Sequence, residues 1–279
     1  MILERACEYK VDIQQLYIDY KQAHDTINRT ELVEIMKEFG IPMKLVRLVK
    51  MTLVNTNCKV KIQGKLSPSF ETAIGLRQGD SLSSLLFNLC MEKITRNVRI
   101  NPGGTIFNRT RQYLVYADDV VILGRSEEYI EKTLEEMAAI THQIGLQMND
   151  TKTKYMINRQ DEYKIKVIEL MGKKYKKVES FKYLGSVMTS LNDIKSEIKS
   201  KIAVGNKCYY ALGPILRRRR SIFQSIKSRL YKTIIRPAVT YEAETWTLKN
   251  KIEKNVNDMG EKDIEENIWT KKGEWTVEN

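Results

Sequence analysis

The feature of this sequence that most constrains its fold is the stretch of residues 112–124. Two short runs of β-branched, aliphatic and aromatic residues, Tyr113–Tyr116 and 120–123, are typical of strands. Only residues 117–119, Ala-Asp-Asp, separate the two runs, so we predict a tight hairpin with two carboxylates at its tip. The alternative is an ordinary turn that uses aspartate for its backbone geometry. Apolar strands on both sides and the repulsion between neighbouring carboxylates favour a pair that is neutralised by a cation.

A second stretch, residues 16–20, supplies a third acid. Asp19 stands at the centre of this β-type run, where an acid is rare unless it has a partner. If this strand lies beside the hairpin, Asp19, Asp118 and Asp119 converge into a site of hard oxygen ligands that suits Mg²⁺. Three carboxylates can hold two such ions roughly 3.5–4 Å apart, the arrangement that clamps the attacking and leaving oxygens of a phosphoryl transfer.

Three segments in a fixed order carry a family resemblance. The first is Tyr-Ile-Asp-Tyr-Lys-Gln-Ala-His-Asp at 17–25, the second begins Gly-Leu-Arg-Gln-Gly-Asp at 75, and the third is Tyr-Ala-Asp-Asp at 116–119. Together they resemble the motifs of reverse transcriptases, and the branch they resemble most is that of non-LTR (LINE-type) retrotransposons. The resemblance extends to about residue 247. It implies an α+β fold in which a polymerase palm, an antiparallel sheet with helices on one face, is followed by a helical thumb.

The resemblance also implies a division of the chain. We expect a palm over residues 1–190 that includes partial fingers elements at 26–74, a basic helical thumb over 191–247, and a C-terminal tail over 248–279. The upstream fingers and endonuclease regions of relatives are expected to be missing. Because basic fingers residues help to neutralise the triphosphate, we expect residues 1–279 alone to extend a primer feebly or not at all.

Local patterns predict further elements. Thr30 is expected to cap a helix that ends at Phe39, and Ser126 to cap a second helix with an inner stripe from Ile130 to Ile144. The remaining expected elements are a helix over 43–54, a hairpin over 58–71, a helix from about 81 to 98, a strand turn at Gly185, and two helices over 192–236 that are broken at Gly213 and Pro214.

The resemblance assigns roles to individual residues. The implied activity is transfer of deoxynucleotides to a DNA primer on an RNA template, with two Mg²⁺ ions, or with Mn²⁺ as the alternative ion. Asp19, Asp118 and Asp119 hold the metals, and Lys152 assists the departure of pyrophosphate. Further residues are expected to contact the substrate: Tyr20, His24, Gly75, Arg77, Gln78, Gly79 and Tyr116. Others are expected to contact nucleic acid: Lys182, Gly185, Arg217, Arg218, Arg219, Arg220 and Lys227.

The charge and the cysteine content of the chain indicate which kinds of partner it can bind. The chain has a net charge of +12, and residues 195–236 hold twelve Lys or Arg and one acid, Glu197. This cluster favours a phosphate-rich partner, although a solvated helix surface is the alternative. Four scattered cysteines without a Cys-x-x-Cys pair argue against a disulfide framework, a disulfide-linked partner and a zinc site. No apolar stretch approaches the roughly 20 residues of a membrane helix, and we expect an intracellular protein, with the nucleus favoured by the resemblance.

Two other functions compete with reverse transcription. The first is a catalytically inactive, nucleic-acid-binding remnant of a retrotransposon. The second is RNA-templated RNA synthesis, which shares the metal chemistry but which the detailed motifs disfavour.

Overall fold

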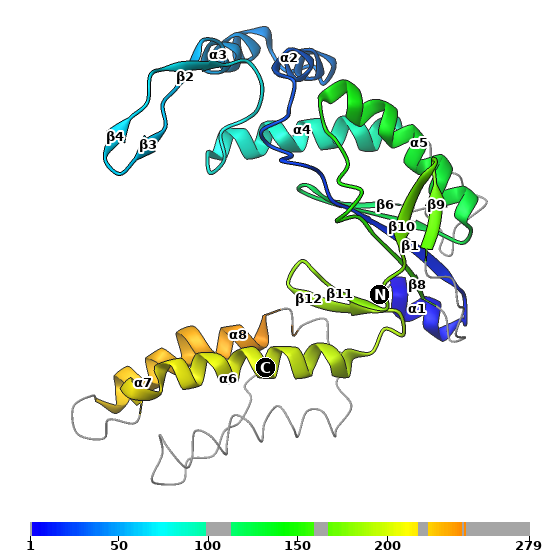
Figure 1. The fold of residues 1–279 in the computed structure, drawn as a ribbon, viewed down its shortest axis with the longest axis vertical. Coiled ribbons are helices and arrows are strands. Elements are labelled where there is room, and N and C mark those ends of the chain that lie inside the picture. The colour runs from blue at the N-terminus through cyan, green and yellow to red at the C-terminus, as the bar shows by residue number, and fades with distance from the viewer. Residues whose placement is uncertain (1, 99–112, 159–166, 217–222, 242, 244–279) are drawn as a thin grey trace. The chain divides into compact units, whose positions relative to one another are not determined.

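The structure is a computed structural model that describes residues 2–98, 113–158, 167–216, 223–241 and 243. The chain forms two compact units, residues 1–179 and residues 180–279 (Figure 1). The hairpin that follows residue 179 therefore groups with the helices after it, rather than with the palm region expected to end at 190. Helices and antiparallel strand pairs occur together in the first unit, which confirms the expected α+β class.

A four-stranded antiparallel sheet forms the centre of the first unit. Its strand order is β6-β7-β1-β8, with bounds Tyr113–Tyr116, Asp119–Gly124, Ile13–Ile18 and Lys154–Asn158. The predicted hairpin is confirmed as β6 and β7, and β1 lies directly beside β7. Asp19 follows the end of β1, so its predicted position at mid-strand was wrong. The local pattern could not locate this strand end, because Tyr20 resumes extended pairing with Met148 directly after Asp19.

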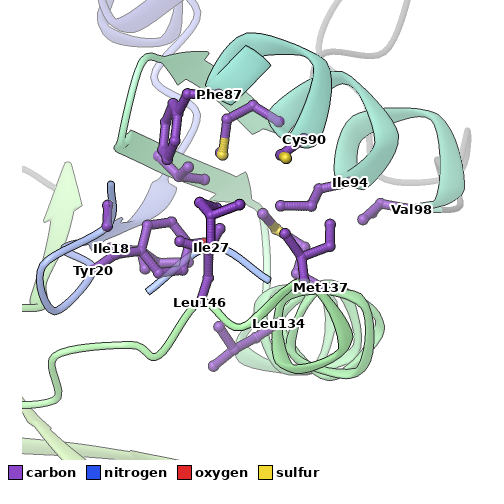
Figure 2. Close-up of a cluster of buried hydrophobic side chains, with 14 of the residues drawn as sticks. Ile18, Tyr20, Ile27, Phe87, Cys90, Ile94, Val98, Leu134, Met137 and Leu146 are labelled. Carbon is purple, nitrogen blue, oxygen red and sulfur yellow. The ribbon is translucent and has the colours of Figure 1, made fainter. Parts of the chain in front are cut away.

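Alternation along the strands gives the sheet two distinct faces. Successive side chains of a strand point to opposite sides, and paired residues share a side. In the register of the sheet Leu16 pairs with Ile122 and with Tyr155, and all three belong to the main buried cluster. That cluster also includes side chains of α4, Ser81–Asn97, and α5, Glu127–Ile144, so these helices cover this face of the sheet (Figure 2).

The helices of the first unit have the predicted apolar faces. The inner stripe of α5 is buried at Ile130, Leu134, Met137, Thr141 and Ile144, as predicted. Helix α2, Arg29–Glu38, is capped by Asn28, whose Oδ1 accepts from the Thr30 and Glu31 amides at 2.9 and 3.4 Å, so the predicted Thr30 cap was wrong. Ser126 occupies the cap position of α5 without a side-chain capping hydrogen bond within the described residues.

Smaller elements complete the first unit. Helix α1 spans Ile2–Glu8 and helix α3 spans Met43–Leu53. The predicted hairpin near Gly64 is confirmed, since the innermost strands β3 and β4 pair inside the outer pair β2 and β5. The bounds of the short strands are β2 Thr56–Cys58, β3 Lys61–Ile62, β4 Lys65–Leu66, β5 Phe70–Thr72, β9 Val167–Leu170 and β10 Lys173–Lys176.

The second unit consists of one hairpin and a group of helices. Strands β11, Ser180–Tyr183, and β12, Ser186–Thr189, turn at Leu184 and Gly185 as predicted. The helices are α6 Ile194–Leu216, α7 Gln224–Leu230, the π-helical segment η2 Tyr231–Ile235, and α8 Arg236–Thr240.

Helix α6 continues through Gly213 and Pro214, so the predicted break at this pair was wrong. A proline removes one backbone donor and its ring crowds the preceding turn, but the helix persists where packing compensates for these losses. Helix α6 contacts β12, η2 and α8. At Gly205 the packing is close, since a Cβ there would lie 2.4 Å from Cγ2 of Val239 on α8.

In the part of the chain that the structure describes, no helix combines the length and the apolar character needed to cross a membrane. The predicted tail over 248–279 lies outside the described residues, as does the arginine cluster at 217–220.

Candidate active site

Two of the three predicted acids lie opposite each other, Asp119 at the start of β7 and Asp19 directly after the end of β1. Ile18 pairs with Val120, and extending this antiparallel register by one residue sets Asp19 opposite Asp119. By the alternation of the strands, both carboxylates fall on the face of the sheet that α4 and α5 do not cover. Asp118 occupies the turn between β6 and β7, because Tyr116 pairs with Asp119. The sheet therefore brings the three acids to one end.

The hairpin that presents the acids has an unusual backbone. Its connection consists of two residues, Ala117 and Asp118, and Ala117 adopts φ +52°. This left-handed conformation is uncommon for a residue with a Cβ, and such positions concentrate at functional sites, where the surrounding structure enforces them.

The protonation of Asp119 is affected by the two other acids. The pKa of Asp119 is raised above its ordinary value, mainly because burial disfavours the charged form and then because Asp118 and Asp19 repel it. The Oδ2 atom of Asp19 is buried and accepts no hydrogen bond from any described residue. It lies 4.0 Å from the ammonium of Lys152.

These residues fit a divalent cation by donor chemistry. Carboxylate oxygens are the ligands that Mg²⁺ prefers, and a buried oxygen without a hydrogen bond together with mutual repulsion is what a cation would relieve. Within the described residues, however, no three His, Cys, Asp or Glu side chains are gathered closely enough to hold one metal ion. The carboxylates would therefore have to turn toward one another when a cation binds.

A segment after α5 fixes Lys152 beside Asp19. The Asn149 amide donates to the Asp19 carbonyl at 2.7 Å, and the Asp19 amide donates to Oγ1 of Thr153 at 3.4 Å. This places the exposed Lys152 ammonium close to the Asp19 carboxylate. Sequence reasoning missed Thr153. This residue is buried, but it lies in a polar stretch whose lack of periodicity gives no sign of burial.

The loop that begins at Gly75 is docked on the segment after β1. The Gly75 amide donates to the Ile27 carbonyl at 2.8 Å, and the Leu76 amide donates to the His24 carbonyl at 2.7 Å. Gly75 has φ +84°, and a Cβ there would lie 2.6 Å from the Asp25 carbonyl oxygen, so only glycine fits. Gly79 has φ +86° but open space around it, so it is required for conformation alone.

Arg29 ties this loop to the elements around it. Its guanidinium donates at 2.7 Å to each of the Leu53, Thr72 and Gly75 carbonyls. The pKa of Arg29 is lowered, first by burial and then by the nearby Arg77. Sequence reasoning missed Arg29, although an arginine in the first turn of a helix opposes the helix dipole and is therefore a signal for another role.

Comparison with known proteins identifies the family. The family described as "Reverse transcriptase (RNA-dependent DNA polymerase)" matches residues 11–188, which is more than half of the chain. The chain belongs to the reverse transcriptase family. Proteins of this family generally use divalent metal ions.

Relatives narrow the branch of reverse transcriptases. The chain is 27% identical over 208 residues to the Pol polyprotein of a type-1 retrotransposable element R2 from Nasonia vitripennis, covering 68% of this chain and 20% of that protein. It is 25% identical over 187 residues to the polyprotein of the R2DM element of Drosophila melanogaster, covering 64% and 18% respectively. The expected non-LTR branch is thereby confirmed, and the chain spans about a fifth of the length of these relatives.

A solved structure with a similar fold is telomerase from Candida tropicalis in complex with a TWJ fragment of telomeric RNA. It has a TM-score of 0.50 and 12% sequence identity, and the match covers 96% of this chain and 46% of that one. At this identity the likeness concerns the fold alone.

The other expected substrate residues of this reverse transcriptase chain differ in exposure. Tyr116 is 67% exposed, and Arg77 and Gln78 are also exposed, so these side chains are accessible to a ligand. The His24 ring stacks on Phe87 with ring centroids 4.3 Å apart and is partly buried. Tyr20 is 5% exposed and belongs to the core, and its buried hydroxyl, which has no hydrogen-bond partner among the described residues, has a pKa raised by burial. The prediction that the Tyr20 side chain contacts substrate was therefore wrong.

The expected nucleic-acid contacts lie in the second unit of this reverse transcriptase chain. Lys182 is exposed on β11, and Gly185 forms the turn with φ +94°. Lys227 is 4% exposed, so the prediction that it binds phosphate directly was wrong for the conformation described. The periodic pattern placed this lysine on a helix without indicating that the helix buries it. Arg217, Arg218, Arg219 and Arg220 lie outside the described residues.

Proposed function

We propose that this chain is the polymerase part of a retrotransposon reverse transcriptase that extends a DNA primer with deoxynucleotides on an RNA template. The observation that carries the proposal is the register of β1 and β7, which sets Asp19 opposite Asp119, with Asp118 in the adjoining turn and Lys152 beside Asp19. Family membership supplies the reaction class, and the R2 polyproteins supply the element type.

The three acids would hold the metal ions. Asp19 and Asp118 are proposed as the principal ligands, with Asp119 assisting from the start of β7 beside the primer terminus. Two Mg²⁺ ions, or Mn²⁺ in their place, would supply Lewis-acid stabilisation of the attacking and leaving oxygens when bound. The carboxylates themselves orient these positions, since β1 and β7 are rigidly paired and the hairpin turn between β6 and β7 is short.

Other residues of the site would position the substrate. Lys152 carries a positive charge 4.0 Å from Asp19, where it can neutralise charge that develops on departing pyrophosphate. Arg77 and Gln78 project from a loop whose base is fixed by Gly75 and Arg29, and they can donate hydrogen bonds to phosphate or base. His24 is proposed to lie near the sugar, and Tyr116 near the primer end.

The hairpin and the basic residues of the second unit would hold the nucleic acid. The exposed Lys182 and the turn at Gly185 are proposed to contact the primer, and the arginines at 217–220 to contact duplex phosphates. Because retrotransposon copying ends in chromosomal DNA, we also propose that the chain acts in the nucleus.

The experiment is primer extension by the whole chain with an RNA template, a DNA primer, deoxynucleotides and Mg²⁺. We expect slow extension that falls by at least about 10²-fold in Asp118→Asn, because the site then loses a charged ligand. Glu135→Gln is the matched control, since it neutralises an exposed carboxylate on α5. Titration calorimetry with Mg²⁺ gives a second readout, in which Asp118→Asn should bind the ion more weakly.

The alternative function is a nucleic-acid-binding remnant without catalysis, favoured by the absence of a gathered three-acid cluster in the described residues. Binding of primer–template without any extension by the wild-type chain, together with Mg²⁺ binding that is equal in the wild type and Asp118→Asn, would support this alternative and contradict the proposed polymerase activity. Extension that is equal in the wild type and Asp118→Asn would show that the proposed acids do not carry it.

A further inference from the structure

Two buried charged side chains lie one turn apart on helix α6. Glu197 is 6% exposed and Lys201 is 7% exposed, and Oε1 of Glu197 lies 3.5 Å from Nζ of Lys201. Burying two charges costs free energy that their mutual attraction repays only when further hydrogen bonds satisfy them. Each side chain makes such a further bond, and both bonds are to the hairpin of β11 and β12.

Glu197 accepts a hydrogen bond from the edge of β12. Its Oε2 accepts from the Val187 amide. In a two-residue hairpin the pair next to the turn, here Tyr183 and Ser186, exchanges hydrogen bonds, and the following pair directs its amides outward. Val187 belongs to that following pair, so its amide would be unpaired without Glu197.

Lys201 reaches the turn of the same hairpin. Its Nζ donates to the Gly185 carbonyl at 3.1 Å and lies 4.8 Å from the centroid of the Tyr241 ring. Leu184 and Gly185 have φ +47° and +94°, as a tight two-residue turn requires. The position of this turn is therefore fixed from α6, by a charge-assisted bond to its backbone.

We propose that Glu197 and Lys201 are positioning residues that clamp the β11–β12 hairpin to α6, so that helix and hairpin move as one body. The proposal rests on the proposed function, in which Lys182 and Gly185 of this hairpin contact the primer. The clamp sets where the hairpin stands relative to the helix that follows it, and thereby where the primer end is held. Neither clamp residue touches substrate in this arrangement, because both side chains are occupied by the hairpin backbone and by each other.

Hydrogen exchange tests the clamp itself, in the whole chain and without any substrate. We expect the Val187 amide to exchange at least about tenfold faster in Glu197→Leu and in Lys201→Met, because the amide loses its acceptor or the acceptor loses its ion pair. Amides of β1 and β7 should be unchanged. Lys199→Met, which removes an exposed charge from the same helix, is the matched control and should exchange like the wild type.

Removing one partner leaves the other charge buried and unpaired, which can prevent folding. The double variant Glu197→Leu/Lys201→Met removes both charges, so no unpaired charge is buried and exchange can be measured on a folded chain. Unchanged exchange at Val187 in the double variant would overturn the clamp, whether or not the chain polymerises.

Primer binding tests the positioning role. In Lys201→Met we expect primer–template to bind on the order of tenfold more weakly, since a displacement of about 1 Å can cost up to 10²-fold. The KM for deoxynucleotide should stay unchanged, and Lys201→Arg should restore binding. The slope of log affinity against log salt should match that of the wild type, because a buried ammonium makes no phosphate contact.

Hydrogen exchange and primer binding together distinguish a failure of the positioning role from a failure of the proposed function. Faster exchange at Val187 together with unchanged primer affinity would overturn the positioning role while leaving the clamp. A reduced salt slope in Lys201→Met would overturn it as well, because the lysine would then be a direct phosphate ligand. A wild-type chain that keeps the clamp but binds no primer–template would contradict the proposed function instead.

Discussion

Asp119 shows how a carboxylate that is held close to other acids is a liability for stability. Its pKa is raised by burial and by the charges of Asp118 and Asp19. The folded state therefore holds a proton on Asp119 at pH values where the unfolded chain has lost it. Stability consequently falls as pH rises from the ordinary aspartate pKa through the raised value, and it stays reduced above that.

Replacement of Asp119 by asparagine should remove this penalty. Without divalent cations, we expect Asp119→Asn to melt about 1–3 °C above the wild type at pH 7, with the difference vanishing near pH 3, where both carry no charge at this position. Thermal unfolding followed by circular dichroism between pH 3 and 8 measures the difference. Glu135→Gln serves as the control and should show no such dependence. A difference that grows as the pH falls would contradict a raised pKa at Asp119.

At the scale of elements, the sequence predicted strongly patterned segments and missed details that depend on tertiary contacts. The β6–β7 hairpin and the buried stripe of α5 were predicted because their periods of two and 3.6 residues are visible in the sequence. The cap at Asn28 was missed because Asn28 and Thr30 are both favourable capping residues, and the choice depends on where the chain leaves the core.

The candidate site likewise contains residues that could be predicted from the sequence and residues that could not. Asp19, Asp118 and Asp119 could be found from their apolar surroundings and from the resemblance, and the register of β1 and β7 brings them to one end of the sheet. Thr153 could not be found, because its partner is a backbone group far away in sequence. The partners of Arg29 are also distant backbone groups, and only its place in the first turn of a helix was a signal in the sequence. Tyr20 and Lys227 were assigned by motif and by charge, and neither signal reports burial.

Helix α6 offers a direct test of its continuity. Pro214 lies in the last part of the described helix and is exposed. If α6 passes through this position, Pro214→Ala restores a helical donor and removes a steric conflict, and we expect a gain of about 1–3 kcal/mol in the free energy of unfolding.

Pro42→Ala is the matched control for this change. Pro42 stands at the start of α3, where the missing amide is not needed, so the same substitution should give no gain. Urea unfolding of both variants measures the difference. Equal effects at the two positions would indicate that the helix ends at Pro214, as the sequence pattern predicts.

At the scale of the whole molecule, the charge is unevenly distributed. Residues 195–236 hold twelve basic residues and one acid, and the net charge of the whole chain is +12, so the rest of the chain is nearly neutral. The one acid in that segment, Glu197, is buried and paired with Lys201. The positive charge of this segment is therefore not offset by any exposed carboxylate of its own.

This distribution predicts where the salt dependence of nucleic-acid binding originates. Each phosphate neutralised by a Lys or Arg contributes about −0.9 to the slope of log affinity against log salt for a DNA duplex. Replacing Arg217, Arg218, Arg219 and Arg220 by glutamine should therefore flatten the slope by up to about 3.6, and weaken binding most at low salt. Fluorescence anisotropy with a labelled primer–template between about 50 and 200 mM salt measures both quantities.

The control removes the same charge from the first unit. Four lysines that are exposed there can be replaced together by glutamine: Lys44, Lys132, Lys174 and Lys176. If the duplex contacts the basic segment alone, this control changes the slope little, because charges that do not contact the duplex act only through a screened field that decays over about 10 Å at 0.1 M salt. Equal flattening by the two variants would indicate general attraction by net charge instead of a located interface. An unchanged slope in the arginine variant would mean that those four side chains face away from the duplex, and the contacts would then have to come from other basic residues of the segment.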